Sequence, residues 1–148
     1  MGILDQFRLD GKKAIVTGGA RGIGQATALA FAEAGADVAV MDIIDTSETV
    51  RLIKEMGREA YSIKVDLTNE DDVNAAVAEA KEKLGAIHVL HNNAGIAHCV
   101  KCEDMTFEEW RMVMKIDLDA VFLVARAVGR IMIARTRTAD IRFAPPVN

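Results

Sequence analysis

The stretch that decides the fold is Thr17-Gly18-Gly19-Ala20-Arg21-Gly22-Ile23-Gly24. It follows a short apolar run over 13–17, which predicts a strand, and precedes a helical pattern that starts near Gly22. Glycines in such a turn let backbone N–H groups approach a pyrophosphate, whose charge the helix N-terminus favours. Gly18 would make the turn, Gly22 would allow close backbone approach, and Gly24 would let helix and strand pack. The alternative is a plain tight turn without a ligand.

The rest of the chain alternates between strand-like and helical patterns. Short runs rich in Val, Ile and Ala predict strands over 13–17, 37–42, 60–65 and 87–92. Helical spacing predicts helices over 22–34 and 46–56, a third that Thr68 caps and Gly85 ends, and a fourth over 107–134. Such alternation is typical of α/β proteins, in which right-handed crossovers build a parallel sheet. The predicted fold class is therefore α/β.

The fourth predicted helix is much longer than the others, and Thr106 can cap it. Apolar residues cover more than one stripe of its surface, and Asp117 is the one charged residue on its main face. This wide apolar surface predicts packing against the sheet and against a second surface. We expect another copy of the chain to supply that surface, so that the 107–134 helix makes a homo-oligomer.

Composition excludes several classes of protein. The 148 residues, 51% of them hydrophobic, describe one globular domain, and a net charge of −4 without a basic block argues against a nucleic-acid partner. The most apolar stretch, 121–134, is interrupted by Arg126 and Arg130 and is shorter than the roughly 20 residues of a membrane helix. Two cysteines cannot form a disulfide scaffold, which favours a reducing, cytoplasmic setting. We expect no membrane span.

Asp42 closes the second predicted strand, close to the spacing of about 20 residues at which an acidic residue reaches the ribose hydroxyls of a dinucleotide. Its carboxylate would repel a 2′-phosphate, which favours NAD over NADP. Arg21 in the glycine-rich turn leaves some room for the phosphorylated cofactor. Alternatively, Asp42 only solvates the end of a strand.

Three motifs stand in order after predicted strands: Thr17-Gly-x-x-x-Gly-x-Gly24, Val65-Asp66-Leu67 and Asn92-Asn93-Ala94-Gly95. Together they resemble the short-chain dehydrogenase/reductase family over residues 11–134. Within that family the sequence is most similar to NAD-dependent polyol and secondary-alcohol dehydrogenases.

The resemblance implies a Rossmann-like, doubly wound sheet of strand order 3-2-1-4, with NAD across the carboxyl ends of the strands. Asp66 and Leu67 would contact the adenine, whereas Asn93, Ala94 and Gly95 would support the central strand and the nearby ribose. The expected cofactor contacts are Gly18, Arg21, Gly22, Ile23, Gly24, Asp42, Asp66, Leu67, Asn93, Ala94 and Gly95.

The sequence departs from the family pattern at three places. His88 stands where the family usually has Asp, which predicts a changed adenine-pocket scaffold. Asp117 occupies the position of a catalytic Asn and is the one candidate catalytic residue; its charge on an apolar face requires a partner or a raised pKa. The family's serine and its Tyr-x-x-x-Lys pair are absent, and the single tyrosine, Tyr61, is expected to be structural.

The family-like pattern stops after Ala134. Residues 135–148 show no alternation and no helical period, and they hold both prolines of the chain. We predict a cofactor-binding domain over 1–134 and an unrelated tail over 135–148. Such a chain looks truncated after the fourth strand and the long helix, as a reading-frame shift or a wrongly joined C-terminus would produce.

Cys99 and Cys102, beside His98, form a C-x-x-C pattern that could indicate a thiol or zinc module. A structural zinc site normally needs four ligands, and His88 and His91 would point to opposite faces of a strand because their spacing is odd. We therefore predict no metal site and place the two cysteines in a variable loop.

The resemblance implies that a complete relative transfers a hydride between NAD and an alcohol, polyol or ketone. This chain would be the NAD-binding portion of such an enzyme, with a small-molecule substrate only in the completed protein. The alternative is a catalytically inactive nucleotide-binding or interaction module, which the missing Tyr-x-x-x-Lys pair favours for the chain as it stands.

Overall fold

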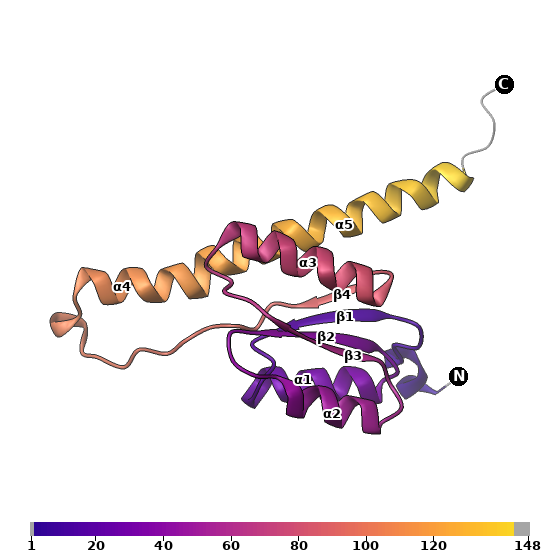
Figure 1. Ribbon diagram of the computed structural model, residues 1–148, viewed down its shortest axis with the longest axis horizontal. Coiled ribbons are helices and arrows are strands. Elements are labelled where there is room, and N and C mark those ends of the chain that lie inside the picture. Colours follow the sequence, from indigo (N-terminus) through magenta and orange to yellow (C-terminus); the bar gives the residue numbers. More distant parts are fainter. Residues whose placement is uncertain (1, 144–148) are drawn as a thin grey trace.

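The computed structural model describes the backbone of residues 2–143 and the side chains of 2–136. The elements are η1 (Ile3–Phe7), β1 (Lys13–Thr17), α1 (Gly22–Glu33), β2 (Asp37–Asp42), α2 (Ser47–Glu55), β3 (Ala60–Lys64), α3 (Glu70–Leu84), β4 (Val89–His91), η2 (Cys102–Asp104), α4 (Phe107–Met114), the π-helix η3 (Lys115–Asp119) and α5 (Ala120–Phe143). Strands alternate with helices as far as β4, as the sequence predicts (Figure 1).

The four strands form one parallel sheet in the order β3-β2-β1-β4, which confirms the α/β class and the implied strand order. The central strands β1 and β2 lie in full register, from Lys13 opposite Asp37 to Thr17 opposite Met41. Their apolar side chains are buried on both faces, as is usual for parallel strands covered by helices. Strand β4 is shorter than predicted and lies at one edge of the sheet.

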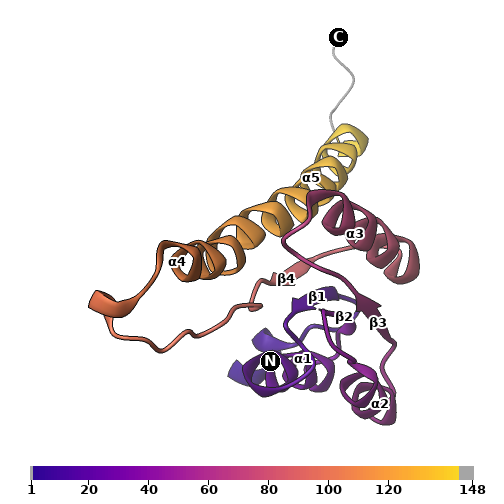
Figure 2. The same cartoon turned by 60° about the vertical axis from the view of Figure 1, so that its left-hand side comes forward.

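Helices cover both faces of the sheet, with α1 and α2 on one side and α3 and α5 on the other (Figures 1 and 2). Because side chains alternate along a strand, Ile15 packs toward the α3 and α5 layer, whereas Val16 packs toward α1 and α2. In contrast, α4 extends beyond the edge of the sheet (Figure 1). Among the described helices, none combines the length and apolar character that crossing a bilayer requires.

Helix α3 begins one residue later than predicted, since Asn69 and not Thr68 is its N-cap. The Asn69 side chain accepts hydrogen bonds from the backbone N–H groups of Asp71 and Asp72, at 2.9 and 3.3 Å. Thr68 is already engaged in the preceding turn, where its N–H and its hydroxyl both donate to Asp66 Oδ1. The capping side chain is therefore the next polar one along the chain.

The long helix differs from the prediction in two ways. It is divided by the π-helix over 115–119, and it continues to Phe143 instead of ending at Ala134. The segment 135–143 contains neither glycine nor proline, so nothing in it interrupts the helical backbone. The expected tail is thus helical as far as Phe143, and residues 144–148 lie outside the described part of the chain. That 135–148 is unrelated to the family stays a prediction.

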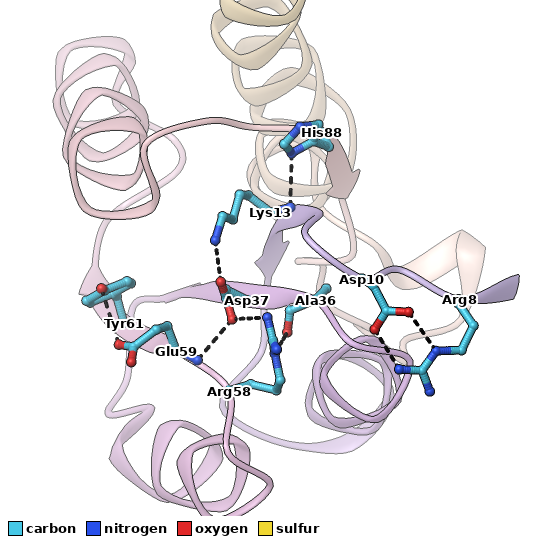
Figure 3. Close-up of polar contacts among 9 residues, drawn as sticks. All are labelled: Arg8, Asp10, Lys13, Ala36, Asp37, Arg58, Glu59, Tyr61 and His88. Carbon is cyan, nitrogen blue, oxygen red and sulfur yellow. Dashed lines mark hydrogen bonds and ion pairs between the residues drawn. The ribbon is translucent and has the colours of Figure 1, made fainter.

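An ionic cluster around the buried Asp37 carboxylate joins the amino ends of the strands (Figure 3). The Asp37 carboxylate, 7% exposed, pairs with Lys13, lies 2.6 Å from Arg58 Nη2 and accepts a hydrogen bond from the Glu59 N–H at 3.1 Å. Burial acts to raise the pKa of Asp37, but the hydrogen bonds from Lys13 and Glu59 and the two positive charges hold it below its usual value. The cluster fixes the end of the sheet at which β1, β2 and β3 begin.

His88 belongs to the same end of the sheet, where its Nδ1 accepts a hydrogen bond from the Lys13 N–H at 3.0 Å (Figure 3). The expectation that His88 changes the adenine pocket is therefore wrong. His88 precedes β4, whereas a cavity lined by Asp66 and Leu67, the expected adenine contacts, lies at the carboxyl ends of the strands. Tyr61 lies on β3, its ring below the Lys83 ammonium and its hydroxyl donating to Glu59.

Candidate functional site

A cavity of about 430 Å³ opens at the carboxyl ends of the strands. Strand β1 lies between β2 and β4, so the order in which strands are added to the sheet changes direction at β1. Ligands of open α/β sheets bind at such a point. Most of the predicted contacts meet in its wall: Gly18, Arg21, Ile23, Asp42, Asp66, Leu67, Asn93, Ala94 and Gly95. Gly22 and Gly24 lie in the same turn without lining the cavity.

The glycine-rich turn, residues 18–24, is built on conformations and contacts that side chains would prevent. A Cβ on Gly24 would lie 2.0 Å from the Gly18 carbonyl oxygen, which agrees with the packing role predicted for Gly24. Gly18 has φ +65° and approaches the Ala94 backbone closely. Gly22 has φ +60° with open space beside it, so its requirement is conformational.

Helix α1 presents its N-terminus at this turn. Its N-cap, Arg21, is extended at φ −158° and, within the described part of the chain, provides no side-chain cap. The first N–H groups of a helix have no partner inside the helix and attract an anion. The turn therefore offers backbone donors to a phosphate group, and the exposed Arg21 side chain adds positive charge to the cavity wall.

Asp42 faces the turn from the end of β2. Its Oδ2 accepts a hydrogen bond from the Ala20 N–H at 3.0 Å, and its Oδ1 accepts one from the Ile44 N–H at 3.3 Å. An ionised carboxylate has about four acceptor positions, so both oxygens can still accept from hydroxyl groups in the cavity. Asp42 therefore does more than solvate a strand end, since it also ties the turn to β2.

The Asn92–Gly95 motif fastens the start of the turn to β4. Asn93 Nδ2 donates to the Thr17 and Gly18 carbonyl oxygens at 3.1 and 3.2 Å. The backbone N–H groups of Asn93 and Ala94 both donate to the Thr17 hydroxyl, at 3.0 and 3.1 Å. Asn93 and Ala94 thus tie the segment after β4 to the end of β1, whereas the expected contact of this motif with a ribose stays a prediction.

The cavity wall also includes side chains that were not among the predicted cofactor contacts: Ile43, Ile44, Val65, Thr68, Ile96 and Ile116. Most of them are sequence neighbours of a predicted contact, such as Asp42, Asp66 or Gly95, so they could have been predicted from that position. Ile116 carried none, because only the folding of the long helix brings it to the cavity. On the same wall, hydrogen bonds from the backbone and hydroxyl of Thr68 lower the pKa of Asp66.

Asp117 lies in the π-helix beside the cavity wall. Its Oδ1 accepts a hydrogen bond from the Ile96 N–H at 2.8 Å, and a Cβ on Gly95 would lie 3.1 Å from the same oxygen. Asp117 is exposed, so the expected apolar surroundings are wrong: solvent hydrates the charge, and the Ile96 N–H adds one hydrogen bond. Its neighbour Ile116, and not Asp117 itself, lines the cavity.

The segment 98–109, which contains both cysteines, holds an acid–base pair. His98 Nε2 lies 3.0 Å from Glu109 Oε1, and hydrogen bonds from the Thr106 backbone, His98 and the Thr106 hydroxyl lower the pKa of Glu109 to about 2. Glu109 and Thr106 also form the capping box of α4, as expected for a Thr106 cap. Cys99 and Cys102 are free and exposed, and across the described residues no three His, Cys, Asp or Glu side chains are grouped to hold a metal.

Fold and cavity together define a dinucleotide-binding α/β domain of the Rossmann type. The sequence profile of the short chain dehydrogenase family matches residues 12–141. The chain therefore belongs to the short-chain dehydrogenase/reductase family.

Known relatives agree with this assignment. The chain is 39% identical to 2-dehydro-3-deoxy-D-gluconate 5-dehydrogenase of Bacillus subtilis over 146 residues, which cover 97% of the chain and 57% of the relative. It is 38% identical to the NAD-dependent glycerol dehydrogenase of Listeria innocua, covering 86% of the chain and 50% of the relative. A short chain dehydrogenase from Mycobacterium paratuberculosis, solved bound to NAD, superposes with a TM-score of 0.84 at 30% identity, covering 88% of this chain and 54% of that one. The chain thus spans about half the length of the relatives it matches.

Proposed function

We propose that this chain is the NAD-binding portion of a short-chain dehydrogenase/reductase. One observation carries the proposal: the glycine-rich turn at the N-terminus of α1 and the Asp42 carboxylate line the same cavity, where Asp42 Oδ2 accepts a hydrogen bond from the Ala20 N–H. The Listeria relative is named for its dependence on NAD, and the Mycobacterium structure contains NAD, which supports the same cofactor here.

The residues of the cavity fit a dinucleotide by their chemistry. In the turn beside the cavity, the open space next to the Gly22 backbone suits a pyrophosphate. Within the cavity, Asp42 suits ribose hydroxyls, and the exposed Ile43 side chain with Leu67 suits a flat apolar ring such as adenine. When bound, the nicotinamide ring of such a cofactor accepts or gives a hydride. The part that this chain supplies is binding and orientation.

In its complete form the protein would oxidise an alcohol or polyol, or reduce a ketone, as a small-molecule substrate. The second candidate is a catalytically inactive nucleotide-binding or interaction module. The absence of a Tyr-x-x-x-Lys pair from the sequence favours this second function for the chain alone. Asp117 then has a positioning role at Ile96, and a catalytic role for Asp117 stays a hypothesis.

We also propose self-association through the long helix, because Phe107, Trp110, Leu118 and Phe122 are each about half or more exposed on α4, η3 and α5. Two free, exposed cysteines fit a reducing compartment, which supports a cytoplasmic location.

Calorimetric titration of NADH into the purified chain tests the proposed cofactor site. We expect saturable binding that Gly18→Ala weakens strongly, since a Cβ there would lie 2.8 Å from the Ala94 Cα at φ +65°. Gly57→Ala is the matched control, because Gly57 also has a positive φ, +76°, but lies outside the cavity with open space around it. Failure of the original chain to bind NADH would overturn the proposal.

A further inference from the structure

The glycine-rich turn is also held from behind, by a side chain that does not line the cavity. Thr49, in α2, is fully buried, and its hydroxyl donates a hydrogen bond to the Gly19 carbonyl oxygen at 2.9 Å. The same hydroxyl accepts a hydrogen bond from Gln25 Nε2, of α1, at 2.9 Å. Gln25 also reaches the Ala20 carbonyl oxygen at 3.5 Å. Side chains of α1 and α2 thus hold the middle of the turn in place through hydrogen bonds.

This contact completes a set of three side-chain attachments that fix two consecutive peptide groups, 18–19 and 19–20. Asn93 holds the Gly18 carbonyl, Thr49 holds the Gly19 carbonyl, and Asp42 holds the Ala20 N–H. The turn is also pressed against the sheet, since a Cβ on Gly19 would lie 2.4 Å from Val40 Cγ1. Of the three side chains, Asn93 and Asp42 line the cavity and Thr49 does not.

We infer that Thr49, with Gln25, is a positioning residue that presets the glycine-rich turn for the dinucleotide and so sets the affinity of the site. The inference rests on the proposed NAD-binding function. A turn that is ordered before the cofactor arrives loses less conformational freedom on binding, which strengthens binding without any new contact. Without the Thr49 hydroxyl, the buried Gly19 carbonyl would have no donor there, and the turn would sample other conformations.

The test compares two threonines at the start of the same helix. Thr49→Val removes the hydroxyl at almost constant volume, whereas Thr49→Ser keeps the hydroxyl. Thr46→Val is the matched control, because Thr46 is 1% exposed and its hydroxyl donates to Ser62 at 2.6 Å, away from the turn. Gln25→Ala is a milder variant that leaves the Gly19 contact in place.

For each variant, the Kd for NADH, the urea midpoint and amide hydrogen exchange over residues 18–24 are measured on the full chain. We expect Thr49→Val to raise the Kd about tenfold and to speed exchange in the turn, with Gln25→Ala less affected and Thr49→Ser close to the original. Thr46→Val should lower the urea midpoint without changing the Kd.

An unchanged Kd in Thr49→Val, or an equal rise in Thr46→Val, would overturn the inference. If the original chain does not bind NADH at all, the proposed function fails. Exchange in the cofactor-free variants then still decides whether Thr49 orders the turn, since unchanged exchange in Thr49→Val would refute it.

Discussion

Asp42 acts on two parts of the cavity at once, because one of its oxygens holds the turn at Ala20 and the other holds the chain at Ile44. Replacing it would therefore alter both the choice of cofactor and the order of the turn. The side-chain oxygen of an Asn at this position can still accept one of these hydrogen bonds. Asp42→Asn therefore separates the effect of the negative charge from the effect of the hydrogen bonds better than Asp42→Ala does.

The His88 side chain makes stability depend on pH. Burial lowers its pKa first, and the positive charges of Arg135, Lys12 and Lys13 lower it further. A folded-state pKa below the unfolded value means that His88 stabilises the fold while neutral, and that this contribution is lost as the pH falls below about 6.5. We expect the free energy of unfolding in urea to decline from pH 7.5 to 5.5, and to decline less in His88→Gln. An equal decline in both proteins would contradict this role.

At the scale of elements, sequence patterns placed β1 and β2 at their observed ends, because buried apolar runs stop where the polar turns begin. They also placed most of the cavity wall, since parallel strands bring their carboxyl ends to one edge. They missed the start of α3, where two neighbouring polar residues compete as caps, and the π-helix, for which the even helical spacing over 107–134 gave no signal. The end of α5 was missed because 135–143 resembles a tail in composition yet contains no helix breaker.

The revised start of α3 is testable by substitution. Asn69→Ala removes the acceptor for two backbone N–H groups and should cost about 1 kcal/mol of the free energy of unfolding. Asn74→Ala is the control, since Asn74 is exposed within the same helix and alanine there favours the helix. Urea unfolding of both variants checks the assignment, and equal stability of the two would place the cap elsewhere.

At the scale of the whole molecule, surfaces suited to association remain open among the described residues. Strands β3 and β4 form the two edges of the sheet, and apolar side chains of the long helix are exposed. We expect association that rises with concentration in sedimentation velocity, and that Phe122→Ser reduces. Ile3→Ser is the control, because Ile3 is equally apolar and exposed but lies in η1. A monomer at every concentration would refute self-association.

The chain alone should not turn over an alcohol with NAD, even if it binds NAD. Oxidation of an alcohol needs a base for the hydroxyl proton, and positioned proton transfer contributes roughly a hundred- to ten-thousand-fold in rate. The tyrosine–lysine pair that serves the family is absent from the sequence, and Asp117 does not line the cavity. NADH formation is measured against polyols and secondary alcohols. Activity that purifies with the chain and disappears in Asp117→Ala would make Asp117 the catalytic base.

The most direct measurement of the central claim is a pair of calorimetric titrations, NADH and NADPH, into the original chain and Asp42→Asn. The original chain should bind NADH more tightly, by roughly tenfold, because the partly screened carboxylate repels a 2′-phosphate. Asp42→Asn should narrow that difference, whereas Asp45→Asn, at an exposed carboxylate outside the cavity, should leave it unchanged. Equal affinities for NADH and NADPH in the original chain, or an unchanged difference between them in Asp42→Asn, would contradict a site in which Asp42 selects NAD.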